Sequence, residues 1–178
     1  MNRVTPTINT QRLTLRGLRA QDFDRYAEIW SDEQVVVHIG GQRRSRDESW
    51  NAFLKIAGHW QITGFGQWAI EDHVSKRVIG QTGFFYGARG YGADFDAHPE
   101  AGWVLAPETH GNGFGREAAF AAHDWFDRVI TGPLVCQITP ENGPSHRLAD
   151  ALGYVKMGAR EDVDLLLRKS PPQRRGLG

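Results

Sequence analysis

The fold of this chain is decided by the stretch His110-Gly111-Asn112-Gly113-Phe114-Gly115-Arg116-Glu117-Ala118. It follows the apolar run 101–105 and precedes a long amphipathic pattern that is typical of a helix. Alternating glycines leave backbone N–H groups exposed, and the first turn of a helix adds partial positive charge. The stretch therefore predicts a binding site for a phosphate or pyrophosphate between a strand and a helix.

Two common phosphate-binding patterns do not fit this spacing. A Walker A loop needs Lys followed by Ser or Thr after its glycines, and no such pair is present here. A dinucleotide loop of the form G-x-G-x-x-G, counted from Gly111, needs glycine where the chain has Arg116. Two alternatives remain, a loop for another phosphate compound and a glycine loop that only caps the helix.

Composition limits the class of protein. With 178 residues, a single domain over 1–178 is expected, with an ordered core at about 10–168 and a flexible tail at 170–178. Lys plus Arg and Asp plus Glu are 21 each, which gives no support for binding nucleic acid or an anionic membrane. One cysteine, Cys136, excludes an intrachain disulfide and favours a reducing compartment. Without a signal core or a long apolar run, a cytoplasmic location is expected.

Periodicity gives the order of the elements. Strands are expected at 10–18, 66–71, 77–85, 101–105, 134–138, 154–157 and 164–168, and helices at 22–30, after Ser45, after Phe114 and at 145–152. The Ser45-x-x-Glu48 pattern is typical of a capping box, and Gly153 is typical of a helix end. Cys136 is expected to be buried in its strand. The prediction is an α/β fold with one mixed, mostly antiparallel sheet of about six to seven strands and about four helices.

Three separated segments carry a family resemblance over roughly residues 10–168. Thr10 to Arg16 has the form T-x-R-L-x-L-R, Glu100 to Ala118 contains [QR]-x-x-G-x-[GA] with His110 in the first position, and Glu141 to Tyr154 has the form E-N-x-x-S…L-G-[FY]. Together they resemble the GNAT superfamily of acetyltransferases, especially the Rim-type branch of ribosomal-protein N-terminal acetyltransferases. The chain departs from that branch at His110, where an aromatic residue is frequent, and at Ala151, where a Lys is frequent.

The resemblance implies transfer of an acetyl group from acetyl-CoA to a primary amine, by direct attack in a ternary complex. The acceptor would be a protein N-terminus or a small-molecule amine. Acetyl-CoA would be the co-substrate, and no metal is implied. Since related enzymes are often dimers, a homodimer is a further expectation. The alternative from another class is a non-catalytic acyl-CoA-binding or regulatory module, and a nucleotide-binding protein is a weaker third.

The resemblance also assigns the coenzyme A site. The strand edge at Val104 and Leu105 would pair with the pantetheine arm, and Asn142 would reach its amides, unless that Asn only forms an Asx turn before a helix. Arg116 or Arg147 would replace the missing Lys at the ribose phosphate. The pyrophosphate would lie on the backbone of the glycine loop, formed by His110, Gly111, Asn112, Gly113, Phe114, Gly115 and Arg116.

Two residues are the candidates for catalysis. Glu100, at the start of a strand, would act as the base through water, or else is an ordinary strand-edge carboxylate. Ser145 would stabilise or protonate the thiolate, or else is a simple N-cap. His98 and Glu71 are weaker candidates for the base, and solvent itself is another.

The remaining polar and aromatic residues carry less specific expectations. The other histidines show no metal-ligand spacing and are expected to be structural. Most tryptophans are expected in the core, although Trp60, Trp68 and Trp103 could line an acceptor pocket. The basic run Arg43, Arg44 and Arg46 is expected to be solvated, with binding of an acidic acceptor or of the ribose phosphate as the alternative. No motif in loop 86–98 or in the first two helices identifies the acceptor.

Overall fold

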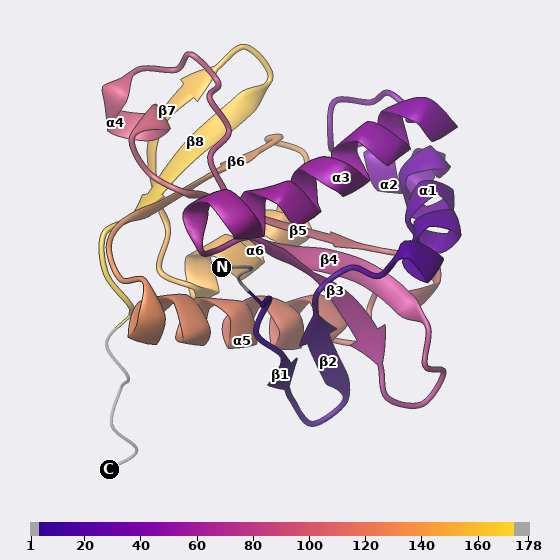
Figure 1. Cartoon of the computed structure of the whole chain (residues 1–178). Coiled ribbons are helices and arrows are strands. Elements are labelled where there is room, and N and C mark those ends of the chain that lie inside the picture. The colour runs from indigo at the N-terminus through magenta and orange to yellow at the C-terminus, as the bar shows by residue number, and fades with distance from the viewer. Residues whose placement is uncertain (1–3, 173–178) are drawn as a thin grey trace.

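The computed structural model describes residues 4–172 and forms one eight-stranded sheet with helices on both faces (Figure 1). The strand order is β1-β2-β3-β4-β5-β6-β8-β7. All neighbouring strands are antiparallel except β5 and β6. The expected α/β fold with a mixed, mostly antiparallel sheet is confirmed.

The strands are β1 (Ile8–Asn9), β2 (Leu13–Arg16), β3 (Gln67–Asp72), β4 (Val78–Phe85), β5 (Glu100–Leu105), β6 (Leu134–Ile138), β7 (Val155–Arg160) and β8 (Val163–Arg168). The helices are α1 (Phe23–Ser31), α2 (Glu33–Val36), α3 (Arg46–Thr63), α4 (Ala93–Asp96), α5 (Phe114–Val129) and α6 (Gly143–Ala151), with short 3₁₀ turns at Ala20–Asp22 and Pro107–Thr109.

Within residues 4–172 the sheet has one strand more than the upper expectation, and there are six α-helices where about four were expected. The unexpected elements, β1, α2 and α4, are only two to four residues long. Periodicity needs a window of about 11 residues or more, so elements this short leave no pattern in the sequence. The part of the expected tail at 173–178 lies outside the described residues.

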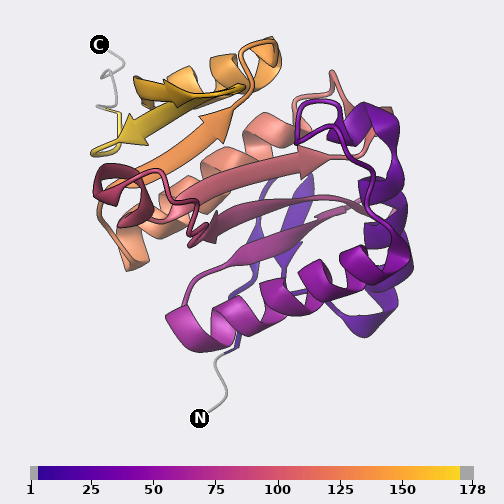
Figure 2. The same ribbon diagram turned by 90° about the horizontal axis from the view of Figure 1, so that it is seen from above.

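The two faces of the sheet are covered by different helices, with α3 and α5 on opposite sides (Figure 2). On one side, α5 and α6 pack on a core cluster that includes Leu13, Ile70 and Phe126. On the other side, α1 and α3 pack on a second cluster that includes Trp30 and Phe53. Each helix therefore buries one apolar face on the sheet, which leaves the ends of the central strands as the place where a ligand can enter.

Helix α3 begins and ends as its sequence predicts. Ser45 Oγ accepts from the backbone N–H of Glu48 at 3.2 Å, and the Glu48 carboxylate accepts from the N–H of Ser45 at 2.7 Å, which completes the capping box. Gly64 ends the helix in the left-handed region at φ 81°. These two caps set where the helix begins and ends.

Strands β5 and β6 separate soon after they begin. They are joined by the crossover through α5, and their parallel register contains a single pair, Glu100 with Val135. Beyond that pair the β5 edge that faces β6 lacks a β-ladder partner among the described residues. A strand edge with free N–H and C=O groups can pair with an extended ligand.

In residues 4–172 no helix is both long and apolar enough to span a bilayer.

Candidate active site

The free edge of β5 belongs to Trp103 and Leu105. The N–H of Ala106 donates to Ile79 O on β4, and the register pairs Val104 with Gln81 on the same strand. Because backbone groups alternate in direction along a strand, Val104 faces β4 and its two neighbours face the gap toward β6. Of the two residues expected to pair with the pantetheine arm, Leu105 therefore lies on the free edge of β5, whereas the backbone groups of Val104 face β4.

The loop before α5 has the conformation that anion binding needs. Gly111 and Gly113 both adopt φ 77°, in the left-handed region where a side chain would be strained. No side chain caps the first turn of α5 at Gly113, so the N–H groups of Phe114, Gly115 and Arg116 point out of the helix end. His110 donates a ring N–H to Leu105 O at 3.0 Å, which ties the start of the loop to the end of β5.

The first strand motif anchors this loop. Arg12 donates from Nε to the Glu117 carboxylate at 2.7 Å and from Nη1 to the backbone oxygen of Asn112 at 2.9 Å. Thr10 Oγ1 donates to the same carboxylate at 2.6 Å, and the Arg12 guanidinium lies 4.5 Å from the centre of the Phe114 ring. The T-x-R-L motif thus fixes the first turn of α5, a role that sequence reasoning did not give it.

The start of α6 forms the other wall of the gap. Asn142 is the N-cap, and its side-chain oxygen accepts from the N–H of Ser145 at 3.2 Å, which matches the Asx-turn alternative. Ser145 is therefore inside the first turn, and the N-cap alternative for it is wrong. Its Oγ accepts from Trp103 Nε1 at 3.1 Å, which leaves the hydroxyl proton available to a ligand in the gap.

Glu100 begins β5 as expected, but its carboxylate is buried in an ion pair. Its side chain is 4 % exposed, and both oxygens accept from Arg89, each at 2.9 Å. This bidentate pair raises the pKa of Arg89, chiefly through its hydrogen bonds to the carboxylate. Arg89 lies in loop 86–98 and was not a candidate in the sequence, because eleven residues separate it from its partner.

A pocket of about 500 Å³ joins these groups on the α3 side of the sheet. At Gly102 the absence of a side chain leaves room in the pocket, because an added Cβ would lie 3.3 Å from Gln67 Nε2 and from the Phe85 ring. The far wall on β6 holds two buried polar atoms, Gln137 Oε1 and Thr139 Oγ1, that have no hydrogen-bond partner within residues 4–172. Unpartnered buried polar atoms that line a cavity are suited to a polar ligand.

The pocket contains some of the sequence candidates and not others. Glu100, Trp103, Val104, Asn142 and Ser145 line it. The weaker candidates for the base do not: Glu71 pairs with Arg16 at 2.7 Å, and His98 lies outside the lining. Trp60 and Trp68 are core residues with exposures of 3 % and 0 %. Arg116 and Arg147 are exposed, on α5 and α6.

Cys136 is buried as expected, and among the described residues no group of three His, Cys, Asp or Glu is placed to hold a metal ion.

Beneath the gap lies a buried histidine, His123 on α5. Its Nδ1–H donates to Ala119 O at 2.7 Å, and its Nε2 accepts from the Tyr154 hydroxyl at 2.9 Å. Burial lowers the pKa of His123 to about 4 and raises the pKa of Tyr154. The imidazole is therefore neutral in the folded protein at neutral pH.

The free energy of unfolding is expected to fall below pH 6.5 because His123 is buried as a neutral imidazole. Between about pH 6.5 and pH 4 the unfolded chain binds a proton at His123 that the folded protein does not bind, so the free energy of unfolding decreases by up to about 3 kcal/mol. Urea unfolding at pH 7 and pH 4 measures this loss. His123→Gln keeps a donor and an acceptor but does not titrate, so its loss should be smaller by that amount. Equal losses in both proteins would contradict the assignment.

Residues 12–155 match the family of acetyltransferase (GNAT) domains. The chain belongs to this family, and it is an acetyl-CoA-dependent acetyltransferase.

Individual relatives agree with this assignment. A solved structure from Bordetella pertussis, assigned to the GNAT family of acetyltransferases, is 30 % identical, with a TM-score of 0.82 and coverage of 92 % of this chain and 99 % of that one. The uncharacterized N-acetyltransferase p20 of Bacillus licheniformis is 26 % identical over 89 % of this chain and 87 % of its own length. The ribosomal-protein-S5-alanine acetyltransferase of Vibrio fischeri shares the fold, with a TM-score of 0.73 at 18 % identity, over 93 % of this chain and 97 % of its own.

Proposed function

We propose that this protein transfers the acetyl group of acetyl-CoA to a primary amine, by direct attack within a ternary complex. The acceptor is a small-molecule amine or a protein N-terminus. The observation that carries the proposal is the gap between β5 and β6. It is open to the acceptor pocket on the α3 side, and at the end of β5 it leads to the glycine loop.

The donor is held by backbone groups along this gap. The N–H groups in the first turn of α5 bind the pyrophosphate, where the helix dipole adds to their attraction. The N–H and C=O of Trp103 and the N–H of Leu105 pair with the pantetheine arm as an added strand would. Arg116 and Arg147 are the exposed cations proposed for the ribose phosphate, and Asn142 lies where it can also meet the pantetheine amides.

The reaction needs three groups near the thioester. The neutral amine attacks the acetyl carbon and the C–S bond breaks. The acetyl group and the amine give an N-acetyl amide, and the proton that the amine loses balances the one that the thiolate takes up to leave as free coenzyme A. An edge N–H of β5 faces the developing oxyanion. Ser145 donates a hydrogen bond from its hydroxyl to the leaving sulfur, which takes its proton from solvent, and Glu100 accepts the proton of the amine through water and returns it to solvent.

The support for these two side chains is their position. Ser145 is fixed at the gap by Trp103 Nε1, and Glu100 lines the pocket on the acceptor side of β5. Gln137 Oε1 and Thr139 Oγ1 lie across the gap and can accept hydrogen bonds from the incoming amine. The acceptor would thus lose its proton and be oriented within one pocket.

An acceptor screen that measures free thiol tests the proposal. We expect release of one thiol per acetylated amine with at least one class of primary amine, and Ser145→Ala should lower kcat while leaving the Kd of coenzyme A unchanged. Thr109→Ala, outside the pocket lining, is the matched hydroxyl control. Coenzyme A binding without thiol release from any amine would leave the non-catalytic module as the better explanation.

A further inference from the structure

The charged residues that line the pocket are mostly cations. They are Arg44, Lys55, Arg89 and Glu100. Arg89 and Glu100 neutralise one another in their bidentate pair. Neither Arg44 nor Lys55 takes part in any ion pair formed by residues 4–172. The pocket therefore holds two positive charges that form no ion pair with the described residues, and exposed Glu48 on α3 is an acid with an electrostatic interaction with Arg44.

Arg44 is held by two aromatic residues and not by an ion pair. Its guanidinium carbon lies 3.5 Å from the centre of the Trp30 ring, and Nη1 donates to the Tyr26 hydroxyl at 3.2 Å. Burial raises the pKa of Tyr26, so this partner is a neutral hydroxyl. Trp30 is itself fixed by a 3.0 Å hydrogen bond from Nε1 to Gln81 Oε1. A stacked planar guanidinium with donors to spare matches the geometry of a carboxylate.

The neighbouring arginines show that this arrangement is specific to Arg44. Arg43 pairs with Glu33 at 2.5 Å, and Arg46 pairs with Asp24 at 2.5 Å, with side chains 60 % and 68 % exposed. Both belong to the surface, as the sequence predicts for a solvated run. Only Arg44 turns into the pocket.

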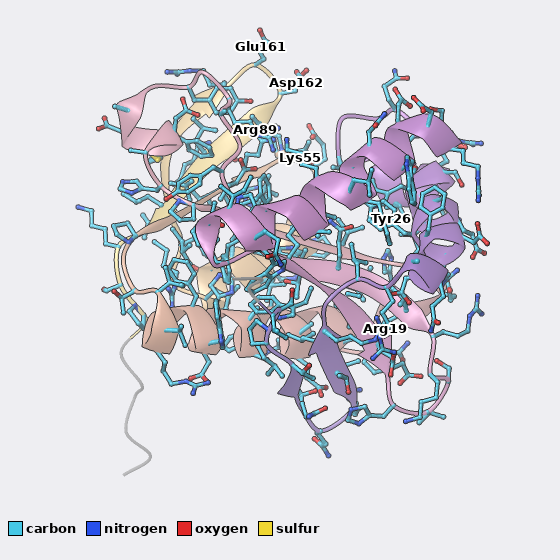
Figure 3. The ribbon with its side chains drawn as sticks, in the orientation of Figure 1. Arg19, Tyr26, Lys55, Arg89, Glu161 and Asp162 are labelled. Carbon is cyan, nitrogen blue, oxygen red and sulfur yellow. The ribbon has the colours of Figure 1, made fainter. Side chains whose placement is uncertain are left out.

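The strand register relates the position of Arg44 to β5. Gln81, which fixes Trp30, is paired with Val104 on β5, and Gly102 lies two residues back along that strand. Glu100, with its partner Arg89, lies at the start of β5 and lines the same pocket. Tyr26 on α1, Lys55 on α3 and Arg89 after β4 are the labelled groups that border the pocket (Figure 3). The acids Glu161 and Asp162, at the β7–β8 turn, are not part of its lining.

We propose that the acceptor of the acetyl transfer is a small amine that also carries a carboxylate, and that Arg44, assisted by Lys55, binds this carboxylate. The inference rests on the proposed function. The amine would lie over Gly102 at the gap, and the carboxylate would lie against the Arg44 guanidinium. A pocket of about 500 Å³ is of the size that holds a small molecule.

Matched acceptors test the charge requirement. The probes are L-amino acids, their primary amides, the corresponding decarboxylated amines, and spermidine as a cationic amine. With the full-length protein and acetyl-CoA, we expect kcat/KM for the acid to exceed that for its amide by about ten- to one hundredfold, the effect of a charge-assisted hydrogen bond. Equal rates for acid and amide, or a preference for spermidine, would overturn the inference while leaving the acetyltransferase function in place.

Variants locate the effect. Arg44→Gln should raise KM for the acid, bring the acid-to-amide ratio close to one, and leave the Kd of coenzyme A unchanged. Lys55→Gln, at an exposed position on α3, should lower the ratio less and cannot act through folding. Arg43→Gln is the matched control and should leave the ratio as in wild type. If Arg44→Gln weakens coenzyme A instead, the residue serves the donor and the inference fails.

Calorimetry supplies a measurement that does not need turnover. Acids and amides are titrated into the protein saturated with coenzyme A, and the acid should bind more tightly in wild type but not in Arg44→Gln. This binding preference without thiol release would support the carboxylate site and count against the proposed catalysis. The absence of any preference would count against the carboxylate site.

Discussion

Glu100→Gln is expected to lower kcat by about 100- to 10,000-fold, the usual contribution of a positioned base. The substitution keeps the shape of the side chain and one oxygen that can still accept from Arg89, but its amide nitrogen faces the other Arg89 donor, so urea unfolding of the variant accompanies the kinetics. The Kd of coenzyme A should stay as in wild type, because the pyrophosphate loop and the β5 edge use backbone groups. Single-turnover and steady-state measurements, with Glu28→Gln on the exposed face of α1 as the control, separate these effects.

The ion pair with Arg89 makes a second explanation testable. If Glu100 acts only by holding loop 86–98 through Arg89, then Arg89→Met should reproduce the loss of kcat. If Glu100 is the base, Arg89→Met should keep a kcat well above that of Glu100→Gln. An unchanged kcat in Glu100→Gln would show that solvent takes the proton.

Local signals in the sequence predicted the part of the fold that we propose to hold the donor. Helix α5 begins at Phe114 and β6 spans Leu134–Ile138, both as expected, because glycine punctuation and apolar runs act over a few residues. Helix α6 spans Gly143–Ala151, whereas the sequence predicts a helix at 145–152, with Ser145 as the possible N-cap and Asn142 in an Asx turn before the helix. Pro144 in the first turn is the signal that favours a start at Gly143, since proline is tolerated in that turn.

The part of the site that faces the acceptor could not be predicted in the same way. The guanidinium of Arg44 stacks on Trp30, whereas its neighbours Arg43 and Arg46 pair with acids on the surface. Such contacts depend on how separate elements pack. The unpartnered atoms of Gln137 and Thr139 appear only when β5 and β6 are seen to separate. Charge and hydrogen-bond partners, which decide the acceptor, are properties of the packed structure.

The largest effect on stability is expected at Arg168, whose side chain is 2 % exposed at the end of β8. Its two terminal nitrogens donate to the carboxylate of Asp127 on α5 at 2.8 and 2.7 Å, and its Nε donates to Leu152 O just after α6 at 2.8 Å. One side chain thus joins the strand to both helices that border the donor site. Asp127→Leu removes the partner of a buried charge and should lower the free energy of unfolding by about 3–5 kcal/mol.

The double variant Asp127→Leu with Arg168→Met distinguishes the charge from the packing. The double variant has no unpaired buried charge, so its free energy of unfolding should be higher than that of Asp127→Leu. It should remain about 1–3 kcal/mol below wild type, because Leu152 O then has no donor. Arg128→Ala, which breaks the exposed i,i+4 pair with Asp124 on the same helix, should cost only about 0.3–0.5 kcal/mol. Urea unfolding of wild type, Asp127→Leu, Arg168→Met and the double variant completes the double-mutant cycle, and Arg128→Ala is measured beside them. If the double variant is as unstable as the sum of the single ones, the two residues stabilise the protein independently, and α5 and α6 are not held to β8 by this ion pair.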